Sequence, residues 1–250
     1  VTGSLSTLPE SNKIHGIKAI LFDSGKVLNE PVTGSWLITP NFFKYVDKCK
    51  FDSISYEKKK EAIGQAGKHM KKHNLIINEQ EEYENFFTYY SIFSKHLPEL
   101  KLKDSDVQNI AKDLVYNYKK YVFFKDALEL IPELSKKYKL AVVSDAWPSL
   151  ENVFVTAGLR EYFSSFIISS IQGVTKPDEL MYKTALNELK VCSKECIFID
   201  DIVENCDGAI RLGIKSFLMS RDDKEYSHNK ILYKNYNIVR NLYDICGFIE

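Results

Sequence analysis

The chain has 250 residues, of which 44% are hydrophobic, 13% aromatic and 27% charged. This composition supports one large domain or two small ones, and it excludes a disordered, collagen-like or linker-like chain. The 34 lysine and arginine residues balance the 34 aspartate and glutamate residues, so the formal net charge is zero. Such a balance gives no general attraction for nucleic acid or for an anionic membrane, and we expect neither as a partner.

Nothing in the sequence indicates export or membrane insertion. The five cysteines are scattered and odd in number, which favours reduced thiols over a disulfide framework. No apolar run approaches the roughly 18 residues that a membrane-spanning helix needs. Residues 1–16 are polar and lack the charged and apolar regions of a signal peptide. We therefore expect a flexible N-terminal extension on a cytoplasmic protein.

Short β-type apolar runs alternate with helical patterns along most of the chain. The predicted strands cover residues 17–22, 140–143, 166–169, 196–199 and, more weakly, 215–218. The helical patterns between them cover residues 127–138, 148–157, 179–189 and 205–212. Gly158 and Gly213 each follow a predicted helix, where a left-handed residue commonly ends it. This alternation predicts an α/β fold, a Rossmann-like doubly wound parallel sheet with helices on both faces.

The interval after the first strand differs in composition. It is rich in Lys, Glu, Tyr and Phe and carries helical stretches over residues 56–73 and 79–96. We therefore predict a core domain of residues 17–34 and 122–250, interrupted by an inserted helical cap of residues 35–121. Residues 226–250 are expected to form a C-terminal helix that closes the sheet. Aromatic residues of the second stretch are expected to form cap core: Tyr83, Phe86, Phe87, Tyr89, Tyr90 and Phe93.

Polar residues gather where the predicted strands end. They are Asp23 after the first strand, Ser144 and Asp145 after the second, and Asp200 and Asp201 after the fourth. In an open α/β sheet, ligands bind outside the carboxyl ends of the strands, so these residues are expected to converge. Carboxylates brought together in this way need a hard cation, for which Mg²⁺ with oxygen ligands is the usual answer.

These groups suit phosphoryl transfer. Lys176, in the loop after the third strand, would offset the carboxylate charge. A serine hydroxyl there would hold phosphate oxygens, and an aspartate in that setting could attack phosphorus to form an aspartyl-phosphate. Positioning and charge neutralisation carry most of the catalysis in such a reaction.

Four segments in the same order resemble motifs I to IV of the haloacid dehalogenase-like (HAD) hydrolase superfamily. They are ILFDSGKVL, LAVVSDA, GVTKPDELMYKTAL and CIFIDDIVENCDGAIRLGI, and the insertion between the first two resembles that family's helical C1 cap. The resemblance implies that Asp23 is the nucleophile and that Lys176 stabilises both nucleophile and phosphate. It implies substrate binding by Ser144, Asp145 and Lys176. It also implies a Mg²⁺ site formed by Asp23, the carbonyl of Gly25, Asp200 and Asp201.

One position departs from the phosphatases of this superfamily. They carry a second aspartate two residues after the nucleophile, as acid for the leaving group and base for water, and here Gly25 stands there. The segment resembles most the subgroup with Asp-x-Gly-Asn-Val, with Lys26 in place of the asparagine. General acid catalysis contributes roughly 10²–10⁴ in rate, so its donor matters. Lys26 and Glu30 are candidates for that donor.

Three interpretations of function remain. The favoured one is a Mg²⁺-dependent phosphatase of a small phosphorylated metabolite. The 2-haloacid dehalogenases also lack the second aspartate, because halide leaves without a proton, but they do not need the acid pair Asp200 and Asp201. A catalytically weak relative that binds a phosphometabolite or a regulatory partner is the third.

His69 and His73, like the lysines at 58–60, are expected to lie on solvated helix faces.

Overall fold

The computed structural model describes residues 13–249 and divides the chain into two compact units. The helical unit comprises Pro31–Val122 and Ala146–Thr156. The core unit comprises the described residues up to Glu30, together with Phe123–Asp145 and the described residues from Ala157 onward. The helical unit thus includes Ala146–Thr156, a segment that the sequence analysis assigned to the core.

The N-terminal extension lies mostly outside the described residues, which begin at Lys13. Ile14, predicted to belong to that extension, is buried and donates its backbone N–H to the carbonyl of Phe248 at 2.7 Å. Residue 14 is therefore paired with the C-terminal end of the core unit.

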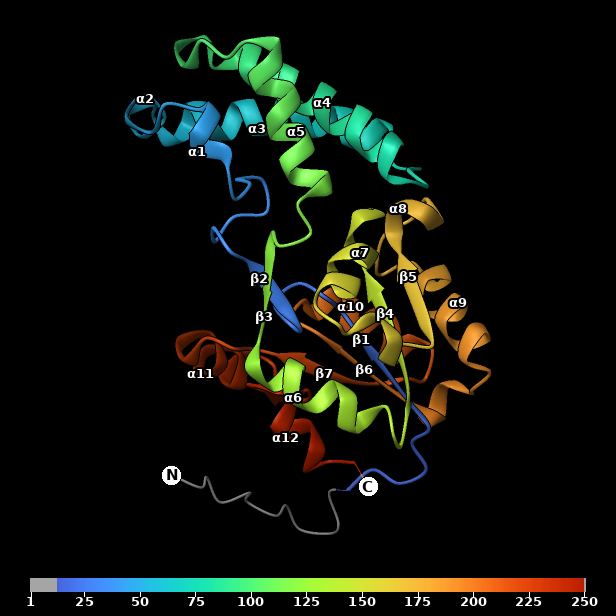
Figure 1. Cartoon of the computed structure of the whole chain (residues 1–250). Coiled ribbons are helices and arrows are strands. Elements are labelled where there is room, and N and C mark those ends of the chain that lie inside the picture. Colours follow the sequence, from blue (N-terminus) through green and yellow to red (C-terminus); the bar gives the residue numbers. More distant parts are fainter. Residues whose placement is uncertain (1–12, 250) are drawn as a thin grey trace. The chain divides into compact units, whose positions relative to one another are not determined.

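The core unit is built on a parallel six-stranded sheet in the order β5-β4-β1-β6-β7-β8 (Figure 1). The strands are β1 Ala19–Phe22, β4 Lys139–Ser144, β5 Ser165–Ile168, β6 Cys196–Asp200, β7 Lys215–Met219 and β8 Asn237–Val239. Every residue of β1 is buried, as expected for a central parallel strand with both faces covered. Phe22, the last residue of β1, is in register with Val142 of β4 and Ile199 of β6, so the three strands end within two residues of one another. The predicted Rossmann-like α/β fold is confirmed.

Helices of the core unit cover this sheet. They are α6 Lys125–Leu134, α8 Ser169–Gln172, α9 Glu179–Leu189, α10 Val203–Arg211, α11 Asp223–Leu232 and α12 Leu242–Cys246, with 3₁₀ turns η3 Arg160–Tyr162 and η4 Ser193–Glu195. α9 begins at the predicted residue because the side chain of Asp178 accepts the N–H of Leu180. After α10, Gly213 has a φ of 82°, the left-handed conformation that ends a helix without a side-chain clash.

The C-terminal segment corrects one prediction. The sequence predicts a helix over residues 226–250, whereas α11 ends at Leu232 and β8 lies between it and α12. Ile238 and Val239 are buried beside β7, where Ile238 is in register with Leu218. A three-residue edge strand is too short to show a strand period, so only its pairing with β7 reveals it.

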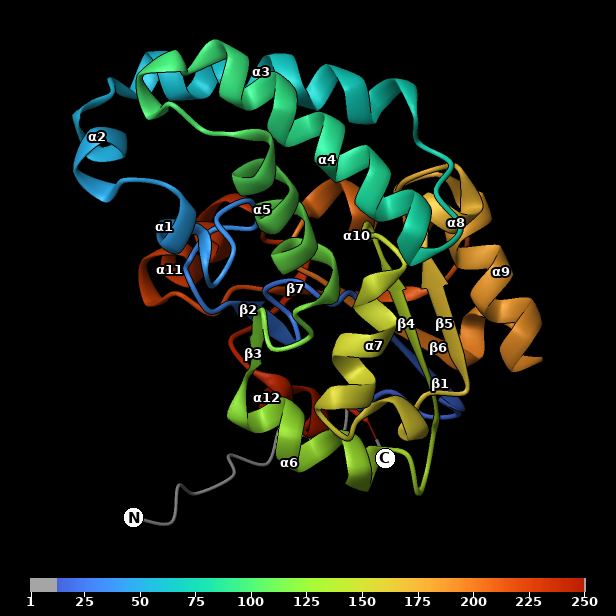
Figure 2. The ribbon, with the colours of Figure 1, turned by 45° about the horizontal axis from the view of Figure 1, so that its top comes forward.

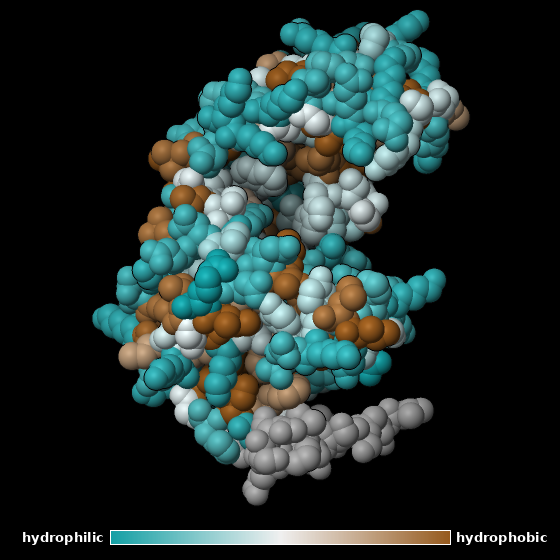
Figure 3. All heavy atoms as spheres, turned by 180° about the vertical axis from the view of Figure 1, so that it is seen from behind, coloured by the Kyte–Doolittle hydropathy of each residue, from teal (hydrophilic) through white to brown (hydrophobic). Residues whose placement is uncertain are grey.

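The helical unit is an all-helical bundle. Its helices are α1 Phe42–Tyr45, α2 Lys48–Ser53, α3 Tyr56–Lys72, α4 Glu79–His96, η2 Pro98–Leu100, α5 Asp104–Tyr116 and α7 Ser149–Thr156. α4 packs against both α3 and α5 (Figure 2). The predicted aromatic core is confirmed, since Phe86, Tyr89, Tyr90 and Phe93 are buried and Tyr83 and Phe87 pack against them. Over this unit, the face drawn in Figure 3 is predominantly hydrophilic.

Two of the segments that connect the units form a small two-stranded sheet. β2 Asn29–Pro31 pairs with β3 Tyr121–Phe123, and the boundary between the units falls within both strands. All five cysteines are free. Among residues 13–249, no helix combines the length and the apolar composition that crossing a bilayer requires.

Candidate active site

Three carboxylates meet at the carboxyl ends of β1 and β6. Asp23 directly follows β1, Asp200 is the last residue of β6, and Asp201 comes next. One oxygen from each carboxylate lies within 4.8 Å of the other two. Asp23 and Asp200 are buried, whereas the side chain of Asp201 is 13% exposed. The register of the sheet brings these residues together, because parallel neighbours end at the same edge.

Lys176 bridges two of these carboxylates from the loop before α9. Its Nζ lies 2.8 Å from Asp23 Oδ1 and 2.6 Å from Asp200 Oδ2, and its side chain is 1% exposed. Burial by itself would lower the pKa of Lys176, but the carboxylates of Asp23, Asp200 and Asp145 outweigh burial and raise it. The lysine therefore remains an ammonium ion over the whole physiological range of pH.

Asp200 is held in one orientation by further donors. Its Oδ1 accepts the backbone N–H of Ile202 at 2.8 Å, and the amide of Asn205 lies 3.1 Å from each of its oxygens. Burial raises the pKa of Asp200 to about 7, against the opposing effect of the ammonium of Lys176. Asn205 itself is positioned by Tyr182, whose hydroxyl donates to the Asn205 carbonyl at 2.7 Å. The sequence analysis assigned no role to Asn205, although it stands five residues after Asp200 on the first turns of α10.

Ser144 and Asp145 lie at the end of β4, next to β1 in the sheet. Ser144 is the last residue of the strand and is buried. Asp145 Oδ1 accepts the backbone N–H of Lys176 at 2.9 Å, so this carboxylate fixes the loop that carries the lysine. Burial raises the pKa of Asp145, while Lys176 lowers it. The structure thus gives Asp145 a contact with Lys176 that sequence reasoning did not anticipate.

The turn after Asp23 is closed by hydrogen bonds of its own backbone. The carbonyl of Ser24 accepts the N–H groups of Leu28 and Asn29, and the amide of Asn29 donates to the Ser24 hydroxyl at 2.7 Å. Within this turn Gly25 is half-buried, and Lys26 has a φ of 57°, in the left-handed region. The Nζ of Lys26 lies 3.4 Å from Asp201 Oδ2.

Arg221, which follows β7 closely, supports this turn and was missed by the sequence analysis. Its guanidinium donates to the carbonyl of Lys26 at 3.2 Å and to the carbonyl of Val27 at 2.6 Å. It also pairs with Asp126 at 3.0 Å and stacks on Phe124, 3.8 Å from the ring centroid. No local pattern marks Arg221, because its partners lie far away in the sequence.

The donor set fits a hard divalent cation. Carboxylate oxygens are preferred ligands of Mg²⁺, and Asp23, Asp200 and Asp201 each offer one within the same small volume. These acids outnumber the one buried ammonium beside them, that of Lys176, so an added cation would reduce their mutual repulsion. The three aspartates could therefore hold the metal.

The remaining candidate residues of the sequence analysis have local contacts of their own. Glu30 is exposed in β2. His69 and His73 lie on and just after α3, their ring centroids 4.3 Å apart, and the Nε2 of His69 is paired with Asn85 Oδ1 at 3.1 Å. Lys58 forms an exposed ion pair with Glu99. His73 is exposed, as predicted, whereas His69 is half-buried against α4 and does not lie on a fully solvated face.

A profile described as haloacid dehalogenase-like hydrolase matches residues 35–219. The chain belongs to this family. The matched residues include Ser144, Lys176, Asp200 and Asp201, whereas Asp23 precedes them. A comparison with curated proteins gave no match.

Solved structures of HAD proteins share the fold over nearly the whole chain. A 2-haloacid dehalogenase from Pseudomonas syringae pv. Tomato DC3000 is 16% identical with a TM-score of 0.62, and the match covers 92% of this chain and 96% of that one. A HAD phosphatase from Thermococcus onnurineus is 20% identical with a TM-score of 0.59 over the same shares, 92% and 96%. YfnB from Bacillus subtilis, bound to magnesium, is 14% identical with a TM-score of 0.62, again over 92% and 96%. At these identities the HAD fold is shared, and a shared fold does not determine the reaction.

Proposed function

We propose that this HAD hydrolase is a Mg²⁺-dependent phosphatase of a small phosphorylated metabolite, with the helical unit as its C1 cap. The observation that carries the proposal is the set of three carboxylates within 4.8 Å beside the buried ammonium of Lys176. A nucleophile alone needs one carboxylate. The acid pair after the neighbouring strand is the arrangement that a hard cation favours.

Asp23 supplies the nucleophile in this proposal. An oxygen of its carboxylate attacks phosphorus, the bond from phosphorus to the leaving oxygen breaks, and an aspartyl-phosphate forms. Water then attacks the same phosphorus, the bond to the Asp23 oxygen breaks, and inorganic phosphate is released. Lys176 offsets the charge on Asp23 and on the phosphate during both steps.

The neighbouring groups orient the reactants. The hydroxyl of Ser144 donates to a phosphate oxygen, and Asp145 keeps Lys176 in place through its backbone N–H. Asp23, Asp200, Asp201 and the carbonyl of Gly25 would hold Mg²⁺, which when bound would neutralise negative charge on the phosphate. The cap would close over the metabolite and exclude water.

Gly25 favours a second candidate. It offers no side chain to protonate a leaving group, and a halide needs no proton, so a 2-haloacid dehalogenase remains the alternative. The same gap is compatible with a catalytically weak relative that binds a phosphometabolite and turns it over slowly.

A release assay separates the three. Purified protein is incubated with a panel of phosphorylated metabolites, with and without Mg²⁺, and inorganic phosphate is measured; 2-haloacids are assayed in parallel for halide. Mg²⁺-dependent phosphate release supports the proposal. Halide release that persists in chelator favours the dehalogenase, and binding of a phosphometabolite without release of either product favours the weak relative.

A further inference from the structure

The segment that follows Ser144 and Asp145 packs on one stripe of α4. Residues spaced three and four apart on a helix share a face, and three such residues of α4 each contact this segment. The contacts pair Glu79 with Asn152, Glu82 with Ser149, and Phe86 with Trp147. The amide of Asn152 donates to Glu79 at 2.8 Å, and the rings of Phe86 and Trp147 lie 4.8 Å apart, edge to face. Residues 147–152 are therefore fixed at three successive points.

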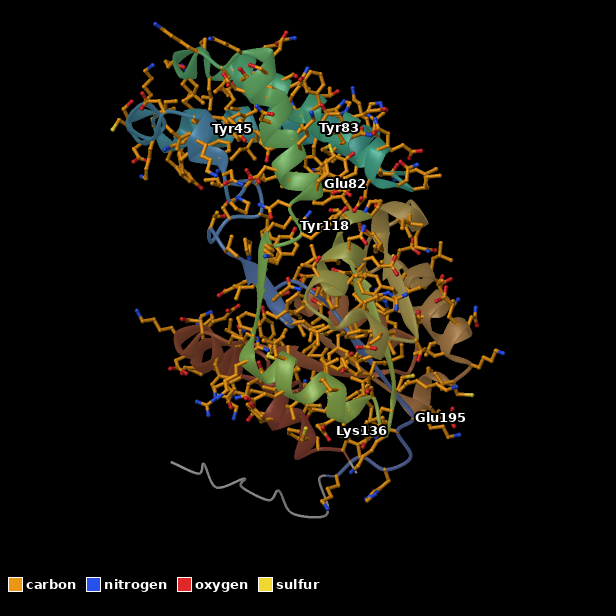
Figure 4. All side chains as sticks on the ribbon, viewed as in Figure 1. Tyr45, Glu82, Tyr83, Tyr118, Lys136 and Glu195 are labelled. Atoms are coloured by element: carbon orange, nitrogen blue, oxygen red, sulfur yellow. The ribbon has the colours of Figure 1, made fainter. Side chains whose placement is uncertain are left out.

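The central contact is the most buried. Glu82, labelled in Figure 4, accepts the backbone N–H of Ser149 at 2.7 Å and its hydroxyl at 2.6 Å. Ser149 is the first residue of α7, so the carboxylate also satisfies a free N–H at a helix start. Both residues are 1% exposed. The two bonds fix the direction in which α7 begins.

Lys120 completes a buried network. Its Nζ donates to the Ser149 hydroxyl at 2.6 Å and to the carbonyl of Leu114 at 2.6 Å, and Lys120 is 5% exposed. The Ser149 hydroxyl accepts a hydrogen bond from Lys120 and donates its own hydrogen to Glu82, so the hydroxyl acts as both acceptor and donor. Ser149 thus lies between the ammonium of Lys120 and the carboxylate of Glu82.

This network does not serve as a nucleophile. A serine between a lysine and a glutamate resembles an activated hydroxyl, but at 1% exposure Ser149 offers no access to a substrate. Burying two charged groups is costly, and apolar side chains would often stabilise the same contact equally well. Such a network defines one geometry, because each hydrogen bond is satisfied only in that arrangement.

The fixed segment is joined to the active site by a short, stiff stretch of chain. Only Ala146, Trp147 and Pro148 separate Asp145 from Ser149. The ring of Pro148 fixes its own φ and restricts the preceding residue, which limits independent movement of the two ends. Asp145 in turn accepts the backbone N–H of Lys176 at 2.9 Å.

We propose that Glu82 is a positioning residue which, through Ser149, couples the helical unit to Ser144 and Asp145 and thereby to Lys176. The proposal rests on the proposed function, in which these three residues serve the phosphate site. A shift of α4 is transmitted through Glu82 and Ser149 to the end of β4, so the order of the phosphate site depends on the packing of α7 against α4.

The test compares Glu82→Gln and Ser149→Ala with a matched control, Asp113→Asn. Asp113 is also a buried carboxylate of the helical unit, but its hydrogen bonds to Asn41 and Asn117 join other segments of that unit. The reporter is exchange of the Lys176 amide hydrogen in the full-length protein, since that N–H is donated to Asp145. The dissociation constant for inorganic phosphate in the presence of Mg²⁺ is the second readout.

Both Glu82→Gln and Ser149→Ala should speed exchange at Lys176 and weaken phosphate binding, each by about tenfold, a change of about 1.4 kcal/mol. Asp113→Asn should leave the exchange rate at Lys176 and the dissociation constant for phosphate unchanged, although its loss of stability should be comparable to that of the other two variants. Unchanged exchange in a folded Ser149→Ala protein overturns the coupling, as does an equal increase in Asp113→Asn. If the wild-type protein binds no phosphate, the proposed function fails, while exchange at Lys176 still decides the coupling.

Discussion

Substitution of Gly208 by alanine tests the packing that holds Lys176. Gly208 lies in α10 where that helix passes the residue after Lys176. A Cβ atom there would lie 2.7 Å from Pro177 Cβ, 2.8 Å from the Tyr182 hydroxyl and 3.1 Å from the Pro177 carbonyl oxygen. Contacts this short force Pro177 or α10 to move, because the backbone on both sides is constrained.

The expected loss of stability follows from opposing contributions. Alanine in place of glycine favours a helix by about 1 kcal/mol. Overpacking typically costs about 1–3 kcal/mol, and displacement of the Tyr182 hydroxyl weakens its bond to Asn205, worth about 1 kcal/mol. The net free energy of unfolding should fall by about 1–3 kcal/mol, which lowers Tm by about 3–9 °C for a chain of this size.

Thermal denaturation and steady-state kinetics measure the two consequences. Displacement of Pro177 moves Lys176, so kcat should fall by about tenfold or more. Gly64→Ala is the matched control, because Gly64 lies in α3 and its added Cβ would meet nothing within 4 Å. That variant should gain about 0.5–1 kcal/mol and keep its activity. If Gly208→Ala is stabilised to the same extent as Gly64→Ala, the close approach of α10 to Pro177 is wrong.

Four further outcomes are expected. The variant Asp23→Asn should fold normally, and its kcat should fall by roughly 10³-fold or more, since the nucleophile is removed. A folded variant that keeps more than about a tenth of the wild-type rate would contradict the covalent route. Chelation should abolish phosphate release and added Mg²⁺ should restore it, whereas undiminished release in chelator would exclude a metal-dependent site. With an aryl phosphate, pre-steady-state kinetics should show a burst of phenol and then slow turnover, because Gly25 provides no base to activate water. The variant Gly25→Asp should speed the slow phase. Rapid hydrolysis of alkyl phosphates without a burst would show that another residue supplies the proton. Burial lowers the pKa of Lys120 to about 8 from 10.5, against the opposing effect of Glu82, Glu79 and Asp113, so between these pH values the unfolded chain binds more protons at this residue, and Lys120 contributes an increase in the free energy of unfolding as pH rises. Denaturant titrations should therefore give a slope against pH that is more positive in the wild type than in Lys120→Met, by at most about 1.4 kcal/mol per pH unit, and equal slopes would contradict it.

Local signals in the sequence determined much of the fold. α4 and α9 begin at the predicted residues, because Asn78 and Asp178 accept N–H groups two or three positions ahead. The central strands follow from short apolar runs, since a parallel strand buried on both faces needs apolar residues throughout. The position of Asp23 and of the pair Asp200 and Asp201 at strand ends was also visible, and the parallel sheet then brings their carboxylates within 4.8 Å.

Only the tertiary structure decided how those residues are held. The contacts of Asn205 with Asp200, of Asp145 with the Lys176 backbone and of Arg221 with the turn after Asp23 join different elements. The same holds for β8, which is a strand because it pairs with β7. It holds too for residues 146–156, which follow a core strand in the chain but belong to the helical unit. Helix caps and apolar runs act over a few residues, whereas these contacts depend on packing between segments tens of residues apart, which no local pattern encodes.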